Sequence, residues 1–311
     1  MIEAQRNAPF LTRAGWHIEA LAWDAYNAWY RAKGLDRASD AAGELLQRVG
    51  PLTSTHTVAR INMQRCFPEA AEPEIDRLLR GMWDNFGRLA GEMPHMHLFE
   101  DDGFFAERVE FIGREKLEAA RDAKQPLVII STHSANWEIS GTAISKTGLP
   151  CYITYRPANN PLIDERILAA RADYGIKLMT AKGGDGAKEL LQTLKRGETV
   201  ALMNDQKMND GIEAPFFGHP SMTAPGPTKL AMRFNCPLVP LSVRRLEGAR
   251  FRIEIHDPIE ISANPDKSAA ITETVTRINQ WVEAEIRKAP EQWFWVHRRW
   301  AKDVYRTGGK R

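Results

Sequence analysis

Cysteine is scarce in this sequence. Among 311 residues there are three, Cys66, Cys151 and Cys236, which lie far apart and form no CxxC pair. An odd number of separated cysteines argues against a disulfide framework and against a cysteine zinc site, and it favours a reducing compartment. We therefore expect no structural disulfides in this protein.

Long apolar runs are absent as well. The longest are short stretches such as PLVII (126–130) and PLVPLSV (237–243), whereas a helix needs roughly 18 to 20 apolar residues to span a bilayer. The polar stretch from Met1 to Pro9 lacks the apolar core of a signal peptide. We expect a chain that neither spans a membrane nor carries an export signal.

Neither sign of charge is in excess over the whole chain. Lysine and arginine number 42 against 40 acidic residues, a net charge of +2, so nothing global favours nucleic acid as a partner. The exception is the stretch from His297 to Arg311, where Asp303 is the only acid. Such a tail is either a solvated end or a contact to an anionic surface. Its basic residues are Arg298, Arg299, Lys302, Arg306, Lys310 and Arg311.

The pattern of apolar residues changes at about residue 105. Residues 1–104 carry helical patterns, of which 74–92 has an apolar period near 3.6, and no strand signal. After about residue 105, short apolar runs alternate with helical stretches, which is typical of βαβ units and a mostly parallel sheet. We predict an α/β domain over 105–311, with a central sheet flanked by helices and the helical region packed on it as one compact unit.

The alternation places individual elements. Asn160 as N-cap, Pro161 at the first helical position and Gly175 beyond the end frame one helix. A last helix is predicted over 266–288. The predicted strands cover residues 127–131, 151–155, 177–179, 199–204, 238–243 and 250–256.

Polar side chains follow three of these strands directly. His133 comes after LVIIST (127–132), Arg156 after CYITY (151–155), and Asp205 with Gln206 after TVALMN (199–204). In open α/β sheets, ligands bind outside the carboxyl ends of the strands. We therefore expect these side chains to face one crevice.

The stretch STHSANWEIS (131–140) places His133 five residues before Glu138. Within one helix the two side chains would point about 140° apart. They can pair if His133 lies on the turn after the strand and Glu138 in the first helical turn, where the helix dipole favours a carboxylate. We expect Glu138 to orient the imidazole, whose other nitrogen takes a proton from a substrate hydroxyl.

Competing motifs fail. GHPSM (218–222) does not fit the G-x-S-x-G nucleophile elbow. In GGDGAKE (183–189), Glu189 stands where a dinucleotide loop has its third glycine. His95 and His97 have no acid-and-histidine set to complete a metal site. We therefore expect neither a cofactor nor a metal.

Six blocks resemble a known family. HSANWE (133–138) is similar to the His-x₄-acid motif of the glycerolipid acyltransferase superfamily, in the Glu form of the late acyltransferases of bacterial lipid A synthesis. The other blocks follow in that family's order. They are INMQRCFPEAAEPEIDRLLRGMWDNFGRLAGEM (61–93), YRPANNPLIDERILAARADYG (155–175), LMNDQKMNDGIEAPFFGHPSMTAPGPTKLA (202–231), CPLVPLSV (236–243) and PEQWFWVHRRW (290–300).

The resemblance implies an enzyme on the cytosolic face of the inner membrane that moves an acyl chain from acyl carrier protein to a hydroxyl of a lipid A precursor. It implies His133 as general base and Glu138 as its orienting partner. Arg156 would hold a phosphate or shape the acceptor site, Asp205 and Gln206 would line the same cleft, and Asn136 would position the helix start or a carbonyl.

Two alternatives remain. The first is an acyltransferase of the same superfamily with another acceptor, either a glycolipid mannoside or a lysophospholipid. The second is a lipid-binding protein that keeps the fold without catalysis. The presence of His133 and its polar neighbours argues against it, because binding alone does not require a base.

The N-terminus departs from the family, many of whose members begin with a hydrophobic anchor. Here AGWHIEALAWDAYNAWYRAKG (14–34) contains two acids, each costing about 2.5 to 3.5 kcal/mol at mid-bilayer. Trp16, Trp23 and Tyr30 recur every seventh residue, with Tyr26 between, as either a packing stripe or a face among lipid headgroups. We expect peripheral attachment through Trp16, Trp23 and Trp29, assisted by the basic tail.

Overall fold

Runs of apolar residues form the centre of a sheet that is covered on both faces. In β2, Val128–Ser131, every residue is buried, which is typical of a parallel strand between two layers of helices. The computed structural model describes residues 9–173, 175–180 and 183–306. Within these ranges the main sheet has seven strands in the order β1-β9-β8-β2-β5-β3-β4. All neighbours run parallel except β8 and β9, which confirms the predicted fold class.

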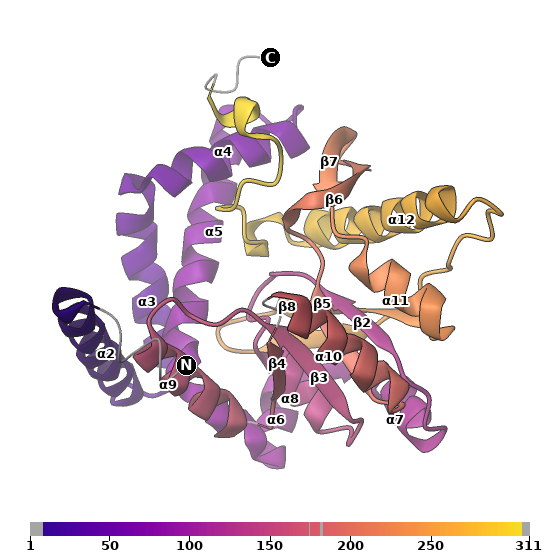
Figure 1. Ribbon diagram of the computed structural model, residues 1–311. Coiled ribbons are helices and arrows are strands. Elements are labelled where there is room, and N and C mark those ends of the chain that lie inside the picture. Colours follow the sequence, from indigo (N-terminus) through magenta and orange to yellow (C-terminus); the bar gives the residue numbers. More distant parts are fainter. Residues whose placement is uncertain (1–8, 174, 181–182, 307–311) are drawn as a thin grey trace.

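The strands alternate with helices along the chain (Figure 1). The main sheet contains β1 Val109–Ile112, β2, β3 Cys151–Tyr155, β4 Lys177–Thr180, β5 Thr199–Met203, β8 Leu238–Arg245 and β9 Phe251–Ile255. A separate antiparallel hairpin consists of β6 Lys207–Phe216 and β7 His219–Thr223.

The α-helices fall into two groups. Those of the N-terminal region are α2 Phe10–Arg31, α3 Leu35–Val49, α4 Ser54–Cys66 and α5 Glu72–Glu92. Those of the α/β part are α6 Asp102–Arg108, α7 Arg114–Asp122, α8 Ile139–Ser145, α9 Pro161–Asp173, α10 Gly183–Lys195, α11 Gly226–Phe234 and α12 Lys267–Lys288. Short 3₁₀ helices are η1 Gly50–Leu52, η2 Met93–Glu100, η3 Pro290–Gln292 and η4 Lys302–Tyr305.

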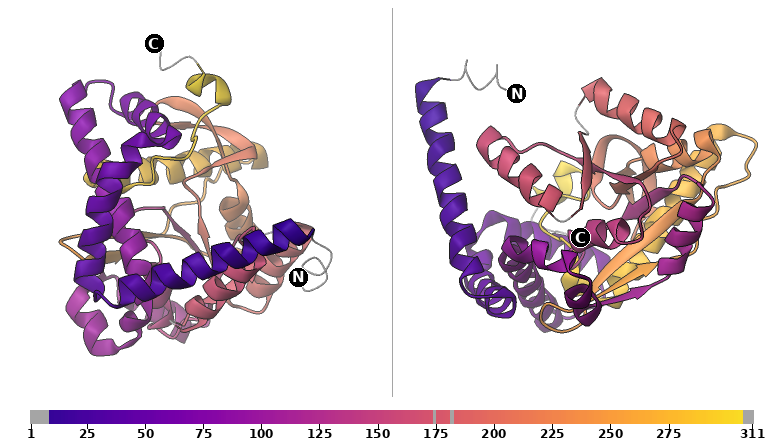
Figure 2. Two further views of the ribbon diagram at one scale, coloured as in Figure 1. Left: turned by 90° about the vertical axis from the view of Figure 1, so that its left-hand side faces the viewer. Right: turned by 90° about the horizontal axis from the view of Figure 1, so that it is seen from below.

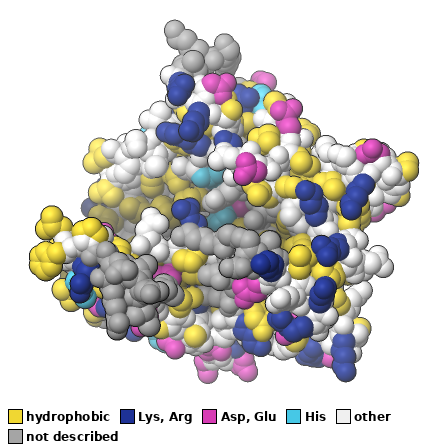
Figure 3. Space-filling model, viewed as in Figure 1, with side chains coloured by type: hydrophobic (Ala, Val, Ile, Leu, Met, Phe, Trp, Pro, Cys, Tyr) yellow, Lys and Arg dark blue, Asp and Glu magenta, His cyan; other side chains and the backbone are white. Residues whose placement is uncertain are grey.

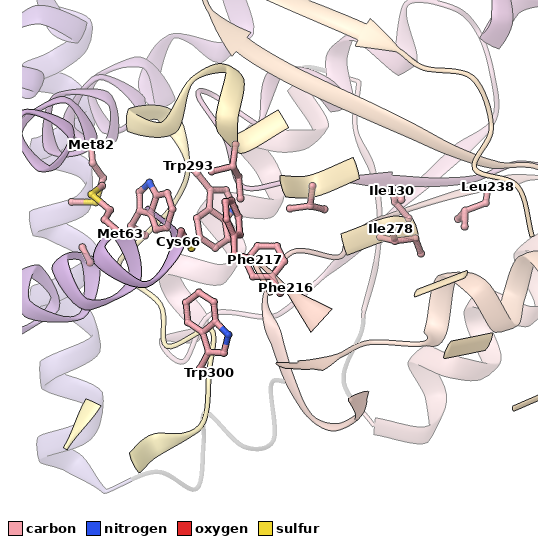
Figure 4. Packing of buried hydrophobic residues seen from close by; sticks show 14 of the residues in the cluster. Met63, Cys66, Met82, Ile130, Phe216, Phe217, Leu238, Ile278, Trp293 and Trp300 are labelled. Carbon is pink, nitrogen blue, oxygen red and sulfur yellow. The ribbon is translucent and has the colours of Figure 1, made fainter. Parts of the chain in front are cut away.

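Alternate residues of the central strands enter two different cores. Ile130 and Leu238 join one cluster with α11, α12 and the N-terminal helices α4 and α5, whereas Ile129 lies in the other with α7, α8 and η2. Figure 4 shows the first cluster, where Met63 from α4 and Met82 from α5 lie close to the buried tryptophans near the C-terminus. The helical region and the sheet therefore share the first of these two cores.

The predicted helix boundaries hold where capping residues define them. Asn160 accepts a hydrogen bond from the backbone N–H of Leu162 at 2.9 Å, and α9 begins at Pro161. The carboxylate of Asp266 accepts from the backbone N–H of Ala269 at 2.7 Å and begins α12. Both caps satisfy donors that a helix start leaves free.

Two parts of the sheet structure were not predicted. The hairpin strand β6, KMNDGIEAPF, is largely polar and exposed over its first half, so it has no apolar alternation to identify it. The strand β1 is only four residues long and lies at the edge of the sheet. Strands this short and polar depend on their pairing partners rather than on local pattern.

Helix α2 lies along the outer edge of the molecule, beside α9 (Figure 2). Asp24 on α2 binds Arg166 on α9 at 2.7 Å, and the backbone carbonyl of Trp16 accepts a hydrogen bond from Asn160. Tyr30 is buried, and the ring centroids of Tyr26 and Tyr30 are 4.8 Å apart. The repeat of Trp16, Trp23 and Tyr30 lies on the side of α2 that packs on the protein, where Tyr30 is buried and Trp16 and Trp23 are half-buried.

The opposite side of α2 is apolar and open to solvent, and Trp29 is the only predicted attachment residue on it. Hydrophobic side chains gather at this end of the molecule (Figure 3). The exposed large apolar residues of α2 are Phe10, Leu11, Ile18, Leu21 and Trp29. Among the described residues, no helix combines the length and the apolar character needed to cross a bilayer. The end of the basic tail, residues 307–311, lies outside the described residues.

Candidate active site

The loop between β2 and α8 (residues 132–138) positions the histidine of the HSANWE motif. It is held from one side by the segment that follows α12: the backbone N–H of Ala135 donates to Gln292 O at 2.9 Å, and that of Phe294 donates to His133 O at 3.0 Å. Ala135 takes a left-handed conformation, with φ +52°. The imidazole of His133 is therefore placed by main-chain bonds to a segment near the C-terminus.

Asp205 is the residue that holds the imidazole. Its Oδ1 lies 2.7 Å from Nδ1 of His133, and its Oδ2 accepts from the backbone N–H of His133, also at 2.7 Å. Trp293 donates its indole N–H to the same Oδ2 at 2.7 Å. Asp205 is fully buried, whereas the His133 side chain keeps 20% of its surface exposed.

The two groups shift each other's pKa. Burial alone would lower the pKa of His133, but the charge of Asp205 and its hydrogen bond outweigh it, with a smaller contribution from Glu138, so the pKa of His133 is raised above its ordinary value. Burial would raise the pKa of Asp205, yet His133 holds it well below its usual range. The pair therefore favours an ionised aspartate that can stabilise a histidine cation.

Glu138 does not orient His133, contrary to the prediction. It lies just before α8, and both of its carboxylate oxygens bind Arg171 of α9, at 2.5 and 2.9 Å. The physical reason is competition for Nδ1: Asp205 reaches that nitrogen from β5, the strand next to β2, while a guanidinium matches the two oxygens of Glu138 with parallel bonds. Glu138 remains a charged neighbour of His133 in the same cavity.

A cavity of about 250 Å³ opens beside the exposed face of His133. Figure 3 shows a hollow at the centre of this face, with histidine side chains inside it. The wall combines aromatic and apolar surface with the two charged groups of the Glu138–Arg171 pair. The lining residues are His133, Trp137, Glu138, Ser140, Gly141, Ile153, Thr154, Tyr155, Arg156, Arg171, Ile176 and Met203.

A second cavity of about 150 Å³ adjoins the first, and Gly141, Ile153 and Ile176 line both. It continues away from His133 along α8 and β3. Together the two cavities form an elongated space, with mostly apolar walls beside the histidine and a more mixed, slightly polar lining beyond it. Such a shape suits a ligand with a reactive head and a hydrocarbon tail.

The other predicted site residues lie in different places. Arg156 is exposed and lines the cavity, as expected. Gln206 is half-buried and does not line the cavity described above. Asp205 is wholly buried behind His133, so its predicted place among the substrate-binding residues is wrong.

The prediction of Asn136 as a substrate-binding residue is also wrong, because Asn136 is fully buried. Its amide N–H donates to Glu92 at 2.9 Å, and Glu92 in turn binds Arg245 of β8. The interior of the motif is thus tied to the end of α5 and to the sheet. The amide N–H of Asn136 thus makes a structural contact away from the cavity.

Two functional contacts were not predicted. Trp293 is the third donor to Asp205, and Phe294 packs against both His133 and Trp137, with ring centroids 6.2 and 5.7 Å apart. The only signal was the cluster of tryptophans in the PEQWFWVHRRW block. Among the described residues, no group of three or more His, Cys, Asp or Glu side chains is arranged to hold a metal ion.

A further histidine, His297, lies behind the site. Its Nδ1 and the Phe294 carbonyl oxygen of the same segment are 2.7 Å apart, so the N–H of His297 donates to that carbonyl. Burial lowers the pKa of His297 to about 4. At neutral pH His297 is therefore uncharged, and it does not compete with His133 for the negative charge of Asp205.

Comparison with known proteins gives a consistent picture. A family model described as bacterial lipid A biosynthesis acyltransferase matches residues 31–302. A lipid A biosynthesis acyltransferase of Haemophilus influenzae is 26% identical over 243 residues, which cover 77% of this chain and 74% of that protein. A lipid A biosynthesis lauroyltransferase of Escherichia coli is 28% identical over 241 residues, which cover 76% of each.

A phosphatidylinositol mannoside acyltransferase of Mycolicibacterium smegmatis is 22% identical over 251 residues, which cover 79% of each chain. Among solved structures, the 1-acyl-sn-glycerophosphate acyltransferase of Thermotoga maritima aligns with 76% of this chain and 98% of its own. The identity is 14% and the TM-score 0.36, a likeness that bears on neither the fold nor the reaction.

Proposed function

This chain belongs to the bacterial lipid A biosynthesis acyltransferase family, and from this premise we propose that it moves a fatty acyl chain from acyl carrier protein to a hydroxyl of a lipid A precursor. Acyl transfer in lipid A synthesis is the activity of the family. The observation that supports the proposal most directly is the His133–Asp205 pair, which leaves Nε2 of a partly exposed imidazole beside a cavity with mostly apolar walls.

The chemistry follows from the free nitrogen. Nε2 of His133 takes the proton of the acceptor hydroxyl as its oxygen attacks the thioester carbonyl carbon. The tetrahedral intermediate then collapses, the C–S bond breaks, and the histidine cation gives its proton to the leaving thiolate. Asp205 keeps the proton-bearing Nδ1 in place and stabilises the cation between these two transfers. The products are an ester and a free thiol.

Binding of the acceptor involves the mouth of the cavity. Arg156 is exposed there, and a guanidinium suits the phosphate of a lipid A precursor. The mostly apolar wall of the cavity beside His133 suits an acyl chain. A mannosylated glycolipid is the second candidate acceptor, because one of the relatives is a phosphatidylinositol mannoside acyltransferase.

Membrane attachment is assigned to the outer side of α2. Its apolar residues span an arc of roughly 120° on a helical wheel and are exposed although the opposite side of the helix packs on the protein. Arg13 and Arg31 both lie about 60° beyond one edge of this arc, where a cation suits anionic headgroups. We place the protein peripherally on the cytoplasmic face of the inner membrane, where its lipid substrate is presented.

An in vitro assay tests the proposal. Purified protein is incubated with acyl carrier proteins of different chain lengths and a tetra-acylated lipid A precursor, and the products are read by mass spectrometry. Wild type should add one acyl chain, and His133→Ala should lose transfer while keeping its circular dichroism spectrum. Transfer by a folded His133→Ala variant would contradict the role of the base. Transfer only from acyl coenzyme A, or only to a mannosylated acceptor, would replace the proposed donor or acceptor.

A further inference from the structure

The buried ion pair in the wall of the cavity has no place in the mechanism above. Glu138 and Arg171 bind each other through two parallel hydrogen bonds, and their side chains are 9% and 17% exposed. Both line the same cavity as His133. Burying two charges beside a reacting group is costly, since neither recovers its full hydration energy. A simple apolar wall would hold an acyl chain equally well.

The guanidinium is fixed by more than its partner. Arg171 lies over the ring of Tyr155, 5.0 Å from its centroid, and Tyr155 binds Asp164 of α9. The same carboxylate accepts from the backbone N–H of Ala158, which anchors the start of α9 against the end of β3. Arg171 is therefore held over Tyr155 beside Glu138.

The charges around His133 come from several elements, and their balance decides whether its imidazole is neutral. Asp205 after β5 favours the cation directly. Glu138, which lines the same cavity, favours it as well. The guanidinium of Arg171 binds both oxygens of Glu138, and because its charge has the opposite sign it acts against that effect. Further titratable or charged groups nearby, among the described residues, include His297 and Arg299 from the C-terminal segment and Arg156 at the mouth of the cavity.

We propose that Arg171 is a positioning residue which acts through Glu138: by offsetting the charge of that carboxylate it makes protonation of His133 less favourable and so enlarges the uncharged, proton-accepting fraction near neutral pH. Glu138 is then a charge that Arg171 balances rather than the partner that orients the base. The inference rests on the proposed role of His133 as the base. It assigns to both residues a function that a binding or packing role would not require.

A double-mutant cycle tests the inference through the acidic limb of the kcat/KM profile, where His133 gains its proton. In Arg171→Gln the charge of Glu138 is uncompensated, so the limb should move to higher pH by about 0.5 units or more. In Glu138→Gln the charge of Glu138 that favours the cation is removed while Arg171 keeps its own charge, so the limb should move to lower pH. The double variant should return close to wild type, and Arg171→Lys should move the limb less than Arg171→Gln.

The matched control is Arg166→Gln, which removes an arginine from the same helix but from a surface pair with Asp24. Its profile should coincide with that of wild type. Equal profiles for all variants, or shifts of the same sign in both single variants, would overturn the inference. A purely structural role predicts lower activity at every pH without displacement of the limb.

A second readout separates this inference from the proposed function. The pKa of His133 can be followed by NMR of ¹⁵N-labelled imidazole, with His133→Gln identifying its signal. The same order of shifts is expected there, because the titration needs no turnover. If wild type transfers no acyl chain, the proposed function fails while the titration still decides the inference. If transfer occurs but neither substitution changes the pKa of His133, only the inference fails.

Discussion

Three donors converge on the carboxylate of Asp205. Oδ2 accepts from the backbone N–H of His133 and from the indole of Trp293, and Oδ1 binds Nδ1 of His133. A carboxylate buried completely needs such partners to stay ionised. Its charge is what holds the imidazole tautomer with Nε2 free, so at the residue scale the site depends on this one acceptor.

Asp205→Asn should therefore lower kcat by about 10² to 10⁴-fold, because the amide presents only one acceptor oxygen and carries no charge to stabilise the histidine cation. Glu138→Gln, measured at its own optimal pH, should lose less than about tenfold. Steady-state acyl transfer of both variants gives the comparison, and thermal melts confirm that each is folded. A greater loss in Glu138→Gln than in Asp205→Asn would restore Glu138 as the orienting partner.

The sequence could predict His133 and Asp205 as neighbours, because both follow strands of a parallel sheet and such ends meet at one edge. It could not predict which acid would take Nδ1. Glu138 is five residues away along the chain and Asp205 is 72, yet adjacent strands bring the distant residue closer. Arg171 was missed for the same reason, since nothing local marks an arginine late in α9 as the partner of Glu138.

At the scale of elements, α2 has two apolar sides with different uses. The side with Tyr26 and Tyr30 packs on the protein, where the hydroxyl of Tyr26 donates to the carbonyl of Ala90. The other side leaves Phe10, Leu11 and Ile18 largely exposed. Heptad spacing identified the aromatic stripe, but spacing alone does not say which side of a helix meets the protein. Only the packing against α9 and η2 decides it.

Substitution on the exposed side should release the protein from membranes. Ile18→Asp together with Leu21→Asp places two charges in the apolar arc, and sedimentation with vesicles containing anionic lipid should fall at least about fivefold, because each charge opposes burial at the interface. The control is Ile112→Asp on the edge strand β1, an exposed apolar residue on another element. If the double variant sediments like wild type and resists salt and carbonate washing, another part of the chain makes the attachment.

The alternation of strands and helices could be predicted from the sequence, because buried parallel strands are continuous apolar runs. The strand β3 was predicted with its observed bounds, Cys151–Tyr155. The hairpin β6–β7 was not, because its residues 207–211 are mostly polar and include a glycine. Contacts with α12 hold the hairpin in place. For example, the side-chain amide of Asn279 donates to the carbonyl of Pro215 at 2.8 Å.

At the scale of the whole molecule, one buried ion pair joins the helical region, the sheet and the motif. Glu92 at the end of α5 binds Arg245 of β8, and it also accepts from Ser39 of α3 at 2.7 Å and from Asn136 of the motif at 2.9 Å. Both members of the pair are almost fully buried. The predicted boundary at residue 104 therefore divides the chain by sequence pattern, but side chains from the two parts are in direct contact. We propose that the helical region and the α/β part unfold as one unit.

Glu92→Gln should cost about 3 kcal/mol of the free energy of unfolding, because it leaves the guanidinium of Arg245 buried without a compensating charge. Glu44→Gln is the matched control: it breaks a pair with Arg48 on the surface of α3, where both side chains are exposed, and should change stability by less than about 0.5 kcal/mol. Urea unfolding, followed by tryptophan fluorescence and by circular dichroism, measures both. If helix and sheet unfold together, the two signals of Glu92→Gln shift to one lower midpoint. Two separate midpoints would mean that the helical region and the sheet are independent domains, and that the pair does not couple α5 to the loop that carries His133.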